Sequence, residues 1–149
     1  MIRKATLEDL DQLTGLFDQY VVFYKKPSNY EKHKAYLKER LENNEAIVYI
    51  AFDETDSKKA IGFALNYITF SSLALNKIII LNDLFVDSTI RKNGIGEKLI
   101  TQTIVLANEI GSNLIRLRTA KNNIVAQGLY HKMGFVRDEV LYSYDLAVK

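Results

Sequence analysis

The chain has 149 residues, 48% of them apolar and only one of them proline, which predicts a compact globular protein rather than a disordered one. Its net charge of +2 gives no sign of a nucleic-acid binder. The absence of cysteine excludes disulfides, thiolate metal sites and a cysteine nucleophile. The N-terminus lacks the apolar segment of a signal peptide, and the aliphatic run Ile78 to Leu81 is too short to span a bilayer. We therefore expect a cytoplasmic protein without nucleic-acid, membrane or metal partners.

The first half of the chain predicts a strand, two helices and two further strands. Thr6 and Asp9 form a helix start, because the hydroxyl caps an open amide and the carboxylate favours the first turn. Apolar residues then recur at helical spacing as far as Tyr20, and Pro27 interrupts the chain. We expect strands over 2–5, 46–52 and 61–67, a first helix beginning after Thr6, and a second helix over 30–41.

The second half predicts alternating strands and helices. Lys77 to Val86 is nearly continuous, isoleucine-rich and apolar, which is typical of a central strand buried on both faces. A helix over 94–110 ends at Gly111 and a shorter one over 124–133 ends at Gly134. We expect further strands over 114–119 and 140–148. The order of elements predicts a single α/β domain over 1–149, in which helices pack on one central sheet.

A glycine-rich loop, Arg91-Lys92-Asn93-Gly94-Ile95-Gly96, joins the central strand to the amphipathic helix. Glycines let backbone amides approach a phosphate, and the helix N-terminus adds about half a positive charge. A solvated turn is an equal alternative for the loop alone. A dinucleotide fingerprint would need glycine at Leu99, and no Walker A run occurs, so both of these phosphate motifs are excluded.

A second group of residues follows at Asn123, Ala126, Tyr130 and Gly134-Phe135. Each has a structural alternative: a helix cap for Asn123, a packed aromatic for Tyr130 and a left-handed helix end for Gly134. Combined with the glycine loop and the strand Leu81-Asn82-Asp83-Leu84-Phe85-Val86, the group resembles the GNAT (Gcn5-related N-acetyltransferase) superfamily.

The resemblance also identifies a subgroup. The chain resembles a subgroup that contains fungal histone and D-amino-acid acetyltransferases and uncharacterised bacterial enzymes. The segments that carry this resemblance are Phe23-Tyr24 with Pro27, and Phe70-Ser71-Ser72. Similarity to diamine and polyamine acetyltransferases is weaker. The resemblance implies a GNAT-type acyl-CoA N-acyltransferase fold, with a mixed central sheet, helices on both faces and two splayed central strands. It implies direct transfer of acetyl from acetyl-CoA to a primary amine, and a homodimer.

The family's motifs imply roles for individual residues. The cofactor is expected to contact Leu84, Phe85, Val86, Arg91, Lys92, Asn93, Gly94, Ile95, Gly96, Glu97, Asn123 and Ala126. Strand residues would hold the pantetheine arm, and the loop would hold the diphosphate. A backbone N–H of the Phe85-Val86 segment would polarise the thioester carbonyl.

Tyr130 matches the family's general acid, since a phenol with a pKa of about 10 stays protonated and can donate to a departing thiolate. Asp83, beside Asn82 in an apolar strand, is the candidate for binding or deprotonating the amine, with a structural strand bulge as an equal alternative. Asn82, Asp83, Phe23 and Tyr24 are expected to line the substrate site. We expect both histidines to face solvent, with His33 a remote second candidate for the base.

Two functions remain open on the sequence alone. The first is catalysis, with a small amine, an amino acid, a lysine-like group or a polyamine as acceptor. The second is a catalytically silent acyl-CoA sensor or interaction module on the same fold, because fold alone does not separate the two. The presence of Tyr130 and Asp83 favours catalysis, since a sensor needs no acid for a leaving group.

Overall fold

The computed structural model describes residues 1–90 and 94–149, so Arg91, Lys92 and Asn93 of the glycine loop lie outside the described residues. The chain divides into two compact units, Met1–Arg118 and Thr119–Lys149, and each is described by itself. The expectation of one domain over 1–149 stays a prediction.

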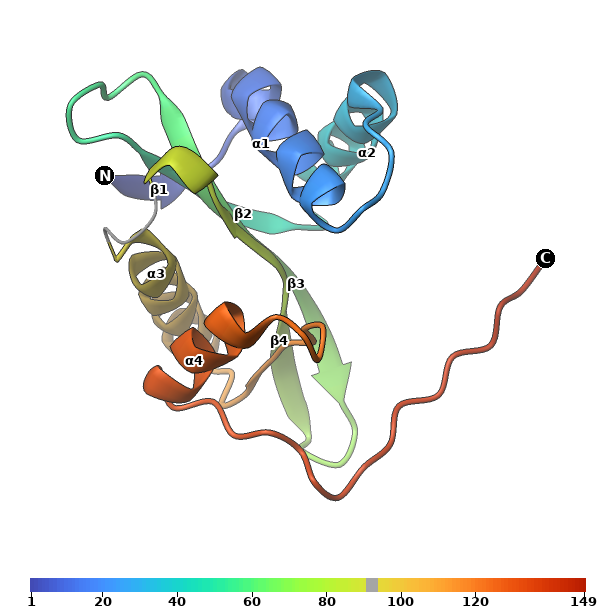
Figure 1. Cartoon of the computed structure of the whole chain (residues 1–149). Helices are drawn as coiled ribbons and strands as arrows, with labels where there is room; N and C mark the ends of the chain where they lie inside the picture. The colour runs from blue at the N-terminus through green and yellow to red at the C-terminus, as the bar shows by residue number, and fades with distance from the viewer. Residues whose placement is uncertain (91–93) are drawn as a thin grey trace. The chain divides into compact units, whose positions relative to one another are not determined.

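The first unit carries the sheet and three of the helices (Figure 1). Its elements are β1 (Ile2–Lys4), the 3-10 turn η1 (Leu7–Asp9), α1 (Leu10–Phe23), α2 (Tyr30–Glu42), β2 (Ile47–Phe52), β3 (Ala60–Ser71), β4 (Asn76–Val86), the 3-10 turn η2 (Ser88–Ile90), α3 (Ile95–Ile110) and β5 (Ile115–Arg116). The second unit contains α4 (Ile124–Lys132). The expected helix start is confirmed, because Thr6 and Asp9 form a reciprocal capping box.

The sheet is mixed and five-stranded, in the order β1-β2-β3-β4-β5. The pairs from β1 to β4 are antiparallel, and β4 pairs with β5 in parallel. Helix α1 packs on one face, where Leu13 and Leu16 join Phe63 in the core. Helix α3 packs on the other, where Thr103 donates a hydrogen bond to Asn66 at 3.2 Å. The predicted mixed sheet with helices on both faces is confirmed.

A bulge in β4 decides which side chains share a face. Leu65 pairs with Asp83 but Asn66 pairs with Leu81, so Asn82 is an extra residue in β4. Side chains of a strand alternate between faces, and directly paired residues lie on the same one. The extra residue therefore moves Asp83 from the α3 face, which Leu81 occupies, to the α1 face.

The parallel pair of strands separates beyond its first two positions. Ile79 pairs with Ile115 and Ile80 pairs with Arg116, and no described residue of β5 pairs with β4 after Ile80. From Leu81 to Val86, β4 keeps β3 on one edge, whereas its other edge has no strand partner among the described residues. The departure of β5 from β4 corresponds to the predicted splay, with β5 as the edge strand of the described sheet.

The strand predicted over 140–148 is wrong for this structure, because residues 135–149 contain neither helix nor strand. Alternating apolar residues describe the two faces of a strand, but a strand also requires a hydrogen-bonding neighbour, and the second unit contains no other strand. The apolar side chains consequently stay exposed, as at Val140 (85%) and Leu146 (87%). The predicted strand over 114–119 is likewise reduced to Ile115–Arg116.

Candidate active site

The buried carboxyl group of Asp83 lies just after the bulge and is 9% exposed. It accepts a hydrogen bond from Asn82 Nδ2 at 3.0 Å and another from the hydroxyl of Tyr20 on α1. Burial raises the pKa of Asp83 above its ordinary value, although both hydrogen bonds act in the opposite direction. The structural interpretation of Asp83 is present, because the residue follows a strand bulge and its carboxyl group accepts two hydrogen bonds. Its role towards an amine stays a prediction.

An aromatic cluster surrounds the Asp83 partner Tyr20. The Tyr20 ring lies edge-on to Phe63, Phe85 and Tyr24, with ring centroids 6.0, 6.1 and 4.9 Å away. Tyr24 in turn contacts Phe23 at 5.2 Å. Phe23 is 50% exposed and Tyr24 38% exposed, so the cluster runs from solvent to the neighbour of a buried carboxyl group. Aromatic faces of this kind attract cations.

The segment between α1 and α2 is fixed by Asp18. Its carboxylate accepts hydrogen bonds from Ser28 Oγ at 2.5 Å and from the backbone N–H of Asn29 at 3.0 Å, and it pairs with His33 Nδ1 at 2.8 Å. The Ser28 hydrogen bond is the main cause of a lowered pKa at Asp18. The prediction that His33 faces solvent is wrong, because Asp18 and the ring of Phe17 hold it half-buried. His131 is exposed as predicted.

The expected cofactor strand, Leu84 to Val86, follows Asp83 directly. These residues pair with Ala64, Phe63 and Gly62 of β3, and their other edge is the one that β5 leaves. A Cβ at Gly62 would lie only 2.9 Å from the carbonyl oxygen of Phe85, so glycine allows the two strands to approach here. The edge of Leu84 to Val86 that faces away from β3 has no described strand partner. The close contact with Gly62 on the β3 side therefore positions this backbone.

The N-terminus of α3 follows the glycine loop. Gly94 has φ +71°, in the left-handed region that favours glycine, and caps this 16-residue helix. The Lys98 N–H donates to the Gly94 carbonyl at 3.0 Å, so Ile95 and Gly96 precede the first bond of the helix. Amides in such positions have no intrahelical acceptor and favour an anion. Glu97 lies in the same first turn.

Ala126 and Tyr130 lie on α4 in the second unit, and Asn123 directly precedes this helix. The Asn123 side chain caps the helix by accepting from the Ala126 N–H at 3.4 Å. Tyr130 is partly buried, with its ring edge-on to Phe135 at 5.8 Å. Gly134 ends the helix region at φ +98°. The structural roles anticipated for Asn123 and Gly134 are therefore present, and the Tyr130 ring does pack against a neighbour.

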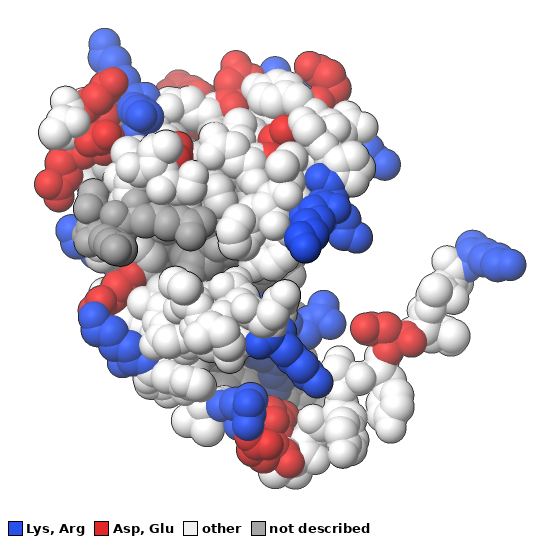
Figure 2. All heavy atoms as spheres, viewed as in Figure 1, with Lys and Arg blue, Asp and Glu red and all other residues white. Residues whose placement is uncertain are grey.

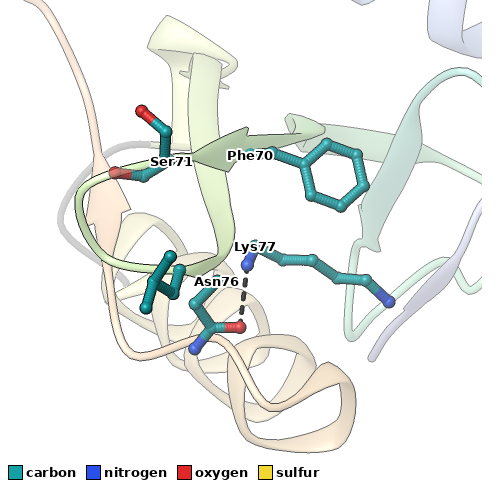
Figure 3. A pocket seen from close by; sticks show the side chains of 6 residues that line it. Phe70, Ser71, Asn76 and Lys77 are labelled. Atoms are coloured by element: carbon teal, nitrogen blue, oxygen red, sulfur yellow. Dashed lines mark hydrogen bonds between the residues drawn. The ribbon is translucent and has the colours of Figure 1, made fainter.

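A hollow at the turn between β3 and β4 lies away from Asp83. Phe70, Ser71, Ser72, Leu75, Asn76 and Lys77 line it. Figure 3 shows the Phe70 and Lys77 side chains on one side of this hairpin. Lys77 is six residues before Asp83, which corresponds to roughly 20 Å along the strand. The Phe70-Ser71-Ser72 segment of the family resemblance is thus separate from the carboxyl site.

On the face drawn in Figure 2, described acidic and basic side chains alternate rather than gather by sign. Among the described residues, none of the helices has the length and apolar content needed to cross a membrane. No cluster of three or more potential metal ligands occurs within residues 1–90 and 94–149.

Comparison with known proteins identifies the family. The Acetyltransferase (GNAT) family matches residues 11–135. The chain is 37% identical over 147 residues to the Uncharacterized N-acetyltransferase YhfO of Bacillus subtilis (strain 168), which covers 99% of this chain and 97% of that protein. The D-amino-acid N-acetyltransferase HPA3 of Saccharomyces cerevisiae is 39% identical over 95 residues, which is 62% of this chain and 57% of that protein.

A solved structure agrees with these matches. The crystal structure of a probable acetyltransferase aligns with a TM-score of 0.92 and 34% identity, covering 100% of this chain and 98% of that one. The resemblance seen in the sequence is therefore confirmed, including its bacterial and D-amino-acid acetyltransferase relatives. The chain belongs to the acetyltransferase (GNAT) family and is an acyl-CoA-dependent N-acetyltransferase.

Proposed function

We propose that this N-acetyltransferase moves acetyl from acetyl-CoA directly to a primary amine bound at Asp83. The observation that carries the proposal is the position of this buried carboxyl group. It lies at a bulge, on the face that carries α1, immediately before the strand segment whose outer edge is open. Acceptor and donor sites on one short segment of β4 would bring amine and thioester together.

The acceptor must lose a proton before it attacks. An alkyl ammonium has a pKa of about 10.4 and no nucleophilic lone pair while protonated. Asp83 binds the ammonium and takes its proton, a role that the raised pKa of its carboxyl group favours. Tyr20 orients the carboxylate, while Phe23 and Tyr24 line the approach from solvent and Asn82 holds the other side of the carboxyl group.

The open edge of β4 and the N-terminus of α3 fit a ligand with an amide-bearing arm and a diphosphate. Acetyl-CoA supplies the activated acetyl thioester. Leu84, Phe85 and Val86 would bind its arm, and one N–H of this segment would polarise the carbonyl. The proposed diphosphate site comprises Arg91, Lys92, Asn93, Gly94, Ile95, Gly96 and Glu97, with Asn123 and Ala126 beside the arm. Tyr130 would donate a proton to the leaving thiolate.

The acceptor class is the open part of the proposal. A small amine, an amino acid and a lysine-like group are the principal candidates, and the D-amino-acid acetyltransferase relative supports including amino acids. A diamine or polyamine is less favoured, because Asn82 is an amide and not a second acid. A silent acyl-CoA sensor is the alternative function. Cytoplasmic location and a homodimer stay predictions.

The test is release of free thiol from acetyl-CoA with a panel of amines, amino acids and lysine peptides. Asp83→Asn should lower kcat/KM for the amine by roughly a hundredfold or more while acetyl-CoA still binds in calorimetry. Tyr130→Phe should lower kcat with a good acceptor, and unchanged turnover would exclude it as the acid. Asp56→Asn, an exposed carboxylate in the turn between β2 and β3, serves as the matched control. Binding of acetyl-CoA without thiol release for any amine would favour the sensor.

A further inference from the structure

A pair of tyrosine hydroxyls lies on the same face of the sheet as Asp83. We propose that Tyr36 and Tyr67, with Arg40 beside them, form a recognition subsite for a carboxylate carried by the acceptor amine. The inference rests on the proposed function, because it assumes that the amine binds at Asp83. It narrows the acceptor to amino-acid-like molecules and disfavours diamines.

The register of the sheet sets the position of Tyr67. Asp83 lies directly opposite Leu65, and Tyr67 is two residues further along β3 on the same face. Tyr67 is thus a diagonal neighbour of Asp83, at a Cβ separation of about 7–8 Å or less. The charge of Asp83 contributes to a raised pKa at Tyr67, which agrees with this proximity. A ligand with two polar groups a few bonds apart can therefore reach both side chains.

The hydroxyl pair of Tyr36 and Tyr67 can donate one O–H hydrogen bond to a ligand. The hydroxyl oxygens of Tyr36 and Tyr67 are 2.5 Å apart, so they share one hydrogen bond. Two phenols carry two hydrogens, and either direction of that bond leaves one O–H to donate elsewhere. Burial, followed by the Tyr36 hydroxyl, raises the pKa of Tyr67, so its hydroxyl stays protonated at neutral pH. Tyr36 is 42% exposed, which gives a ligand access to the pair.

Arg40 lies beside the tyrosine pair and adds N–H donors at this end of the site. Its guanidinium carbon lies 4.6 Å from the centre of the Tyr36 ring. Arg40 Nε bonds Glu45 and Nη2 pairs with Glu39, both at 3.1 Å, which fixes the side chain in place. Arg40 also forms a hydrogen bond with Tyr36, which is the main cause of the raised pKa of Arg40. The Arg40 side chain is only 19% exposed, and its guanidinium is held against the Tyr36 ring.

The site therefore has two unlike ends. Asp83 accepts hydrogen bonds and carries negative charge, whereas the tyrosine pair and Arg40 donate. An α-amino acid, with ammonium and carboxylate on one carbon, complements both ends. A diamine has no carboxylate to accept the O–H that the tyrosine pair leaves, which selects against such a ligand. The polar side chains that face the Asp83 carboxyl group are Tyr20 from α1, Tyr67 from β3 and Asn82 from β4.

The experiment compares amino acids with the amines formed by removing their carboxylate. Alanine is set against ethylamine, phenylalanine against phenethylamine, in both enantiomers, with 1,3-diaminopropane as the diamine. Thiol release gives kcat/KM for the full-length protein, corrected for the unprotonated fraction of each amine. We expect each amino acid to exceed its amine by about tenfold or more, the size expected for one hydrogen bond to a charged group. The diamine should be the poorest acceptor.

Variants test whether the tyrosine pair causes this preference. Tyr36→Phe and Arg40→Gln should each lower the ratio of kcat/KM for the amino acid to that for its amine by roughly tenfold. Tyr30→Phe removes a hydroxyl from the same helix, where it contacts Asp11, and should leave the ratio unchanged. A structural defect would lower both rates together and keep the ratio.

The outcomes separate the two proposals. Thiol release at equal rates for an amino acid and its amine, or an unchanged ratio in Tyr36→Phe, would refute the carboxylate subsite and leave the proposed function intact. A preference for lysine side chains in peptides without a nearby carboxylate would also refute it. Absence of thiol release with every amine would refute the proposed function, and the subsite with it.

Discussion

Replacing Gly62 by alanine tests how closely β3 must approach the proposed cofactor strand. The added Cβ would lie 2.9 Å from the carbonyl oxygen of Phe85, and 3.5 Å from Ile95 Cγ2 and Leu99 Cδ1. The last two are ordinary contacts, but the first is shorter than real Cβ atoms allow. Because the obstructing atom is backbone, β4 itself must move by about half an ångström to restore van der Waals contact.

The displacement of β4 in Gly62→Ala should lower the free energy of unfolding by a predictable amount. Overpacking in a well-packed core costs roughly 1–3 kcal/mol. One kcal/mol shifts the Tm of a domain of this size by about 2–4 °C, so Gly62→Ala should lower Tm by roughly 2–12 °C. The same movement displaces the Phe85-Val86 backbone, so we also expect a higher KM for acetyl-CoA.

Thermal unfolding followed by circular dichroism and steady-state kinetics provide the two measurements. Gly15→Ala is the matched control, because Gly15 lies within α1 and a Cβ there meets nothing within 4 Å. That substitution should be neutral or stabilise by about 0.5–1 kcal/mol, since alanine favours helix. Wild-type Tm and KM in Gly62→Ala would refute the argument that the tight contact positions β4.

Two further substitutions test charged contacts. Arg3 donates to both oxygens of Asp9 at 2.8 Å and is the main cause of its lowered pKa, so Asp9→Asn should lower Tm at neutral pH. The stabilisation is present above the unfolded pKa of about 3.9 and is lost as pH falls through the folded value, so the two Tm curves should converge in acid. Tyr20→Phe removes a donor that lowers the pKa of Asp83, so the acidic limb of the pH profile of kcat/KM should move to higher pH. A role of Tyr20 in packing alone would reduce activity without moving that limb.

Local patterns predicted most elements of the fold. Thr6 and Asp9 indicate the start of the first helix, and Gly111 indicates the end of α3, because capping depends on residues close in sequence. The long apolar run was enough to identify β4. The prediction of a strand over 140–148 was wrong, because the alternating pattern describes only side chains. Strand formation also depends on a neighbouring strand elsewhere in the chain.

The geometry of the proposed acceptor site depends on features that local patterns do not contain. The sequence offered a strand bulge as one interpretation of Asp83, but the extra residue Asn82 and the resulting face of Asp83 follow from the pairing of β4 with Leu65 and Asn66. Tyr36 and Tyr67 are 31 positions apart, and nothing in the sequence near either one indicates their hydrogen bond. Tyr20 was visible only as a member of an apolar helical stripe. Asp83 was singled out from the sequence and its role stays a prediction, whereas the neighbours Tyr20, Tyr36 and Tyr67 were not singled out.

The burial of Asp83 gives a prediction for stability that is opposite in sign to that for Asp9. Its folded pKa is raised, so ionisation opposes folding, and the wild type should lose stability relative to Asp83→Asn as pH rises above about 3.9. The asparagine keeps the shape of the side chain without its charge. We expect the Tm of Asp83→Asn to exceed that of the wild type at neutral pH, with the difference shrinking towards pH 4, while the amine reaction is largely lost. A wild type that is the more stable protein at neutral pH would mean that Asn82 and Tyr20 fully compensate the buried charge, and the carboxyl group would then be a structural acceptor rather than a base held ready for the amine.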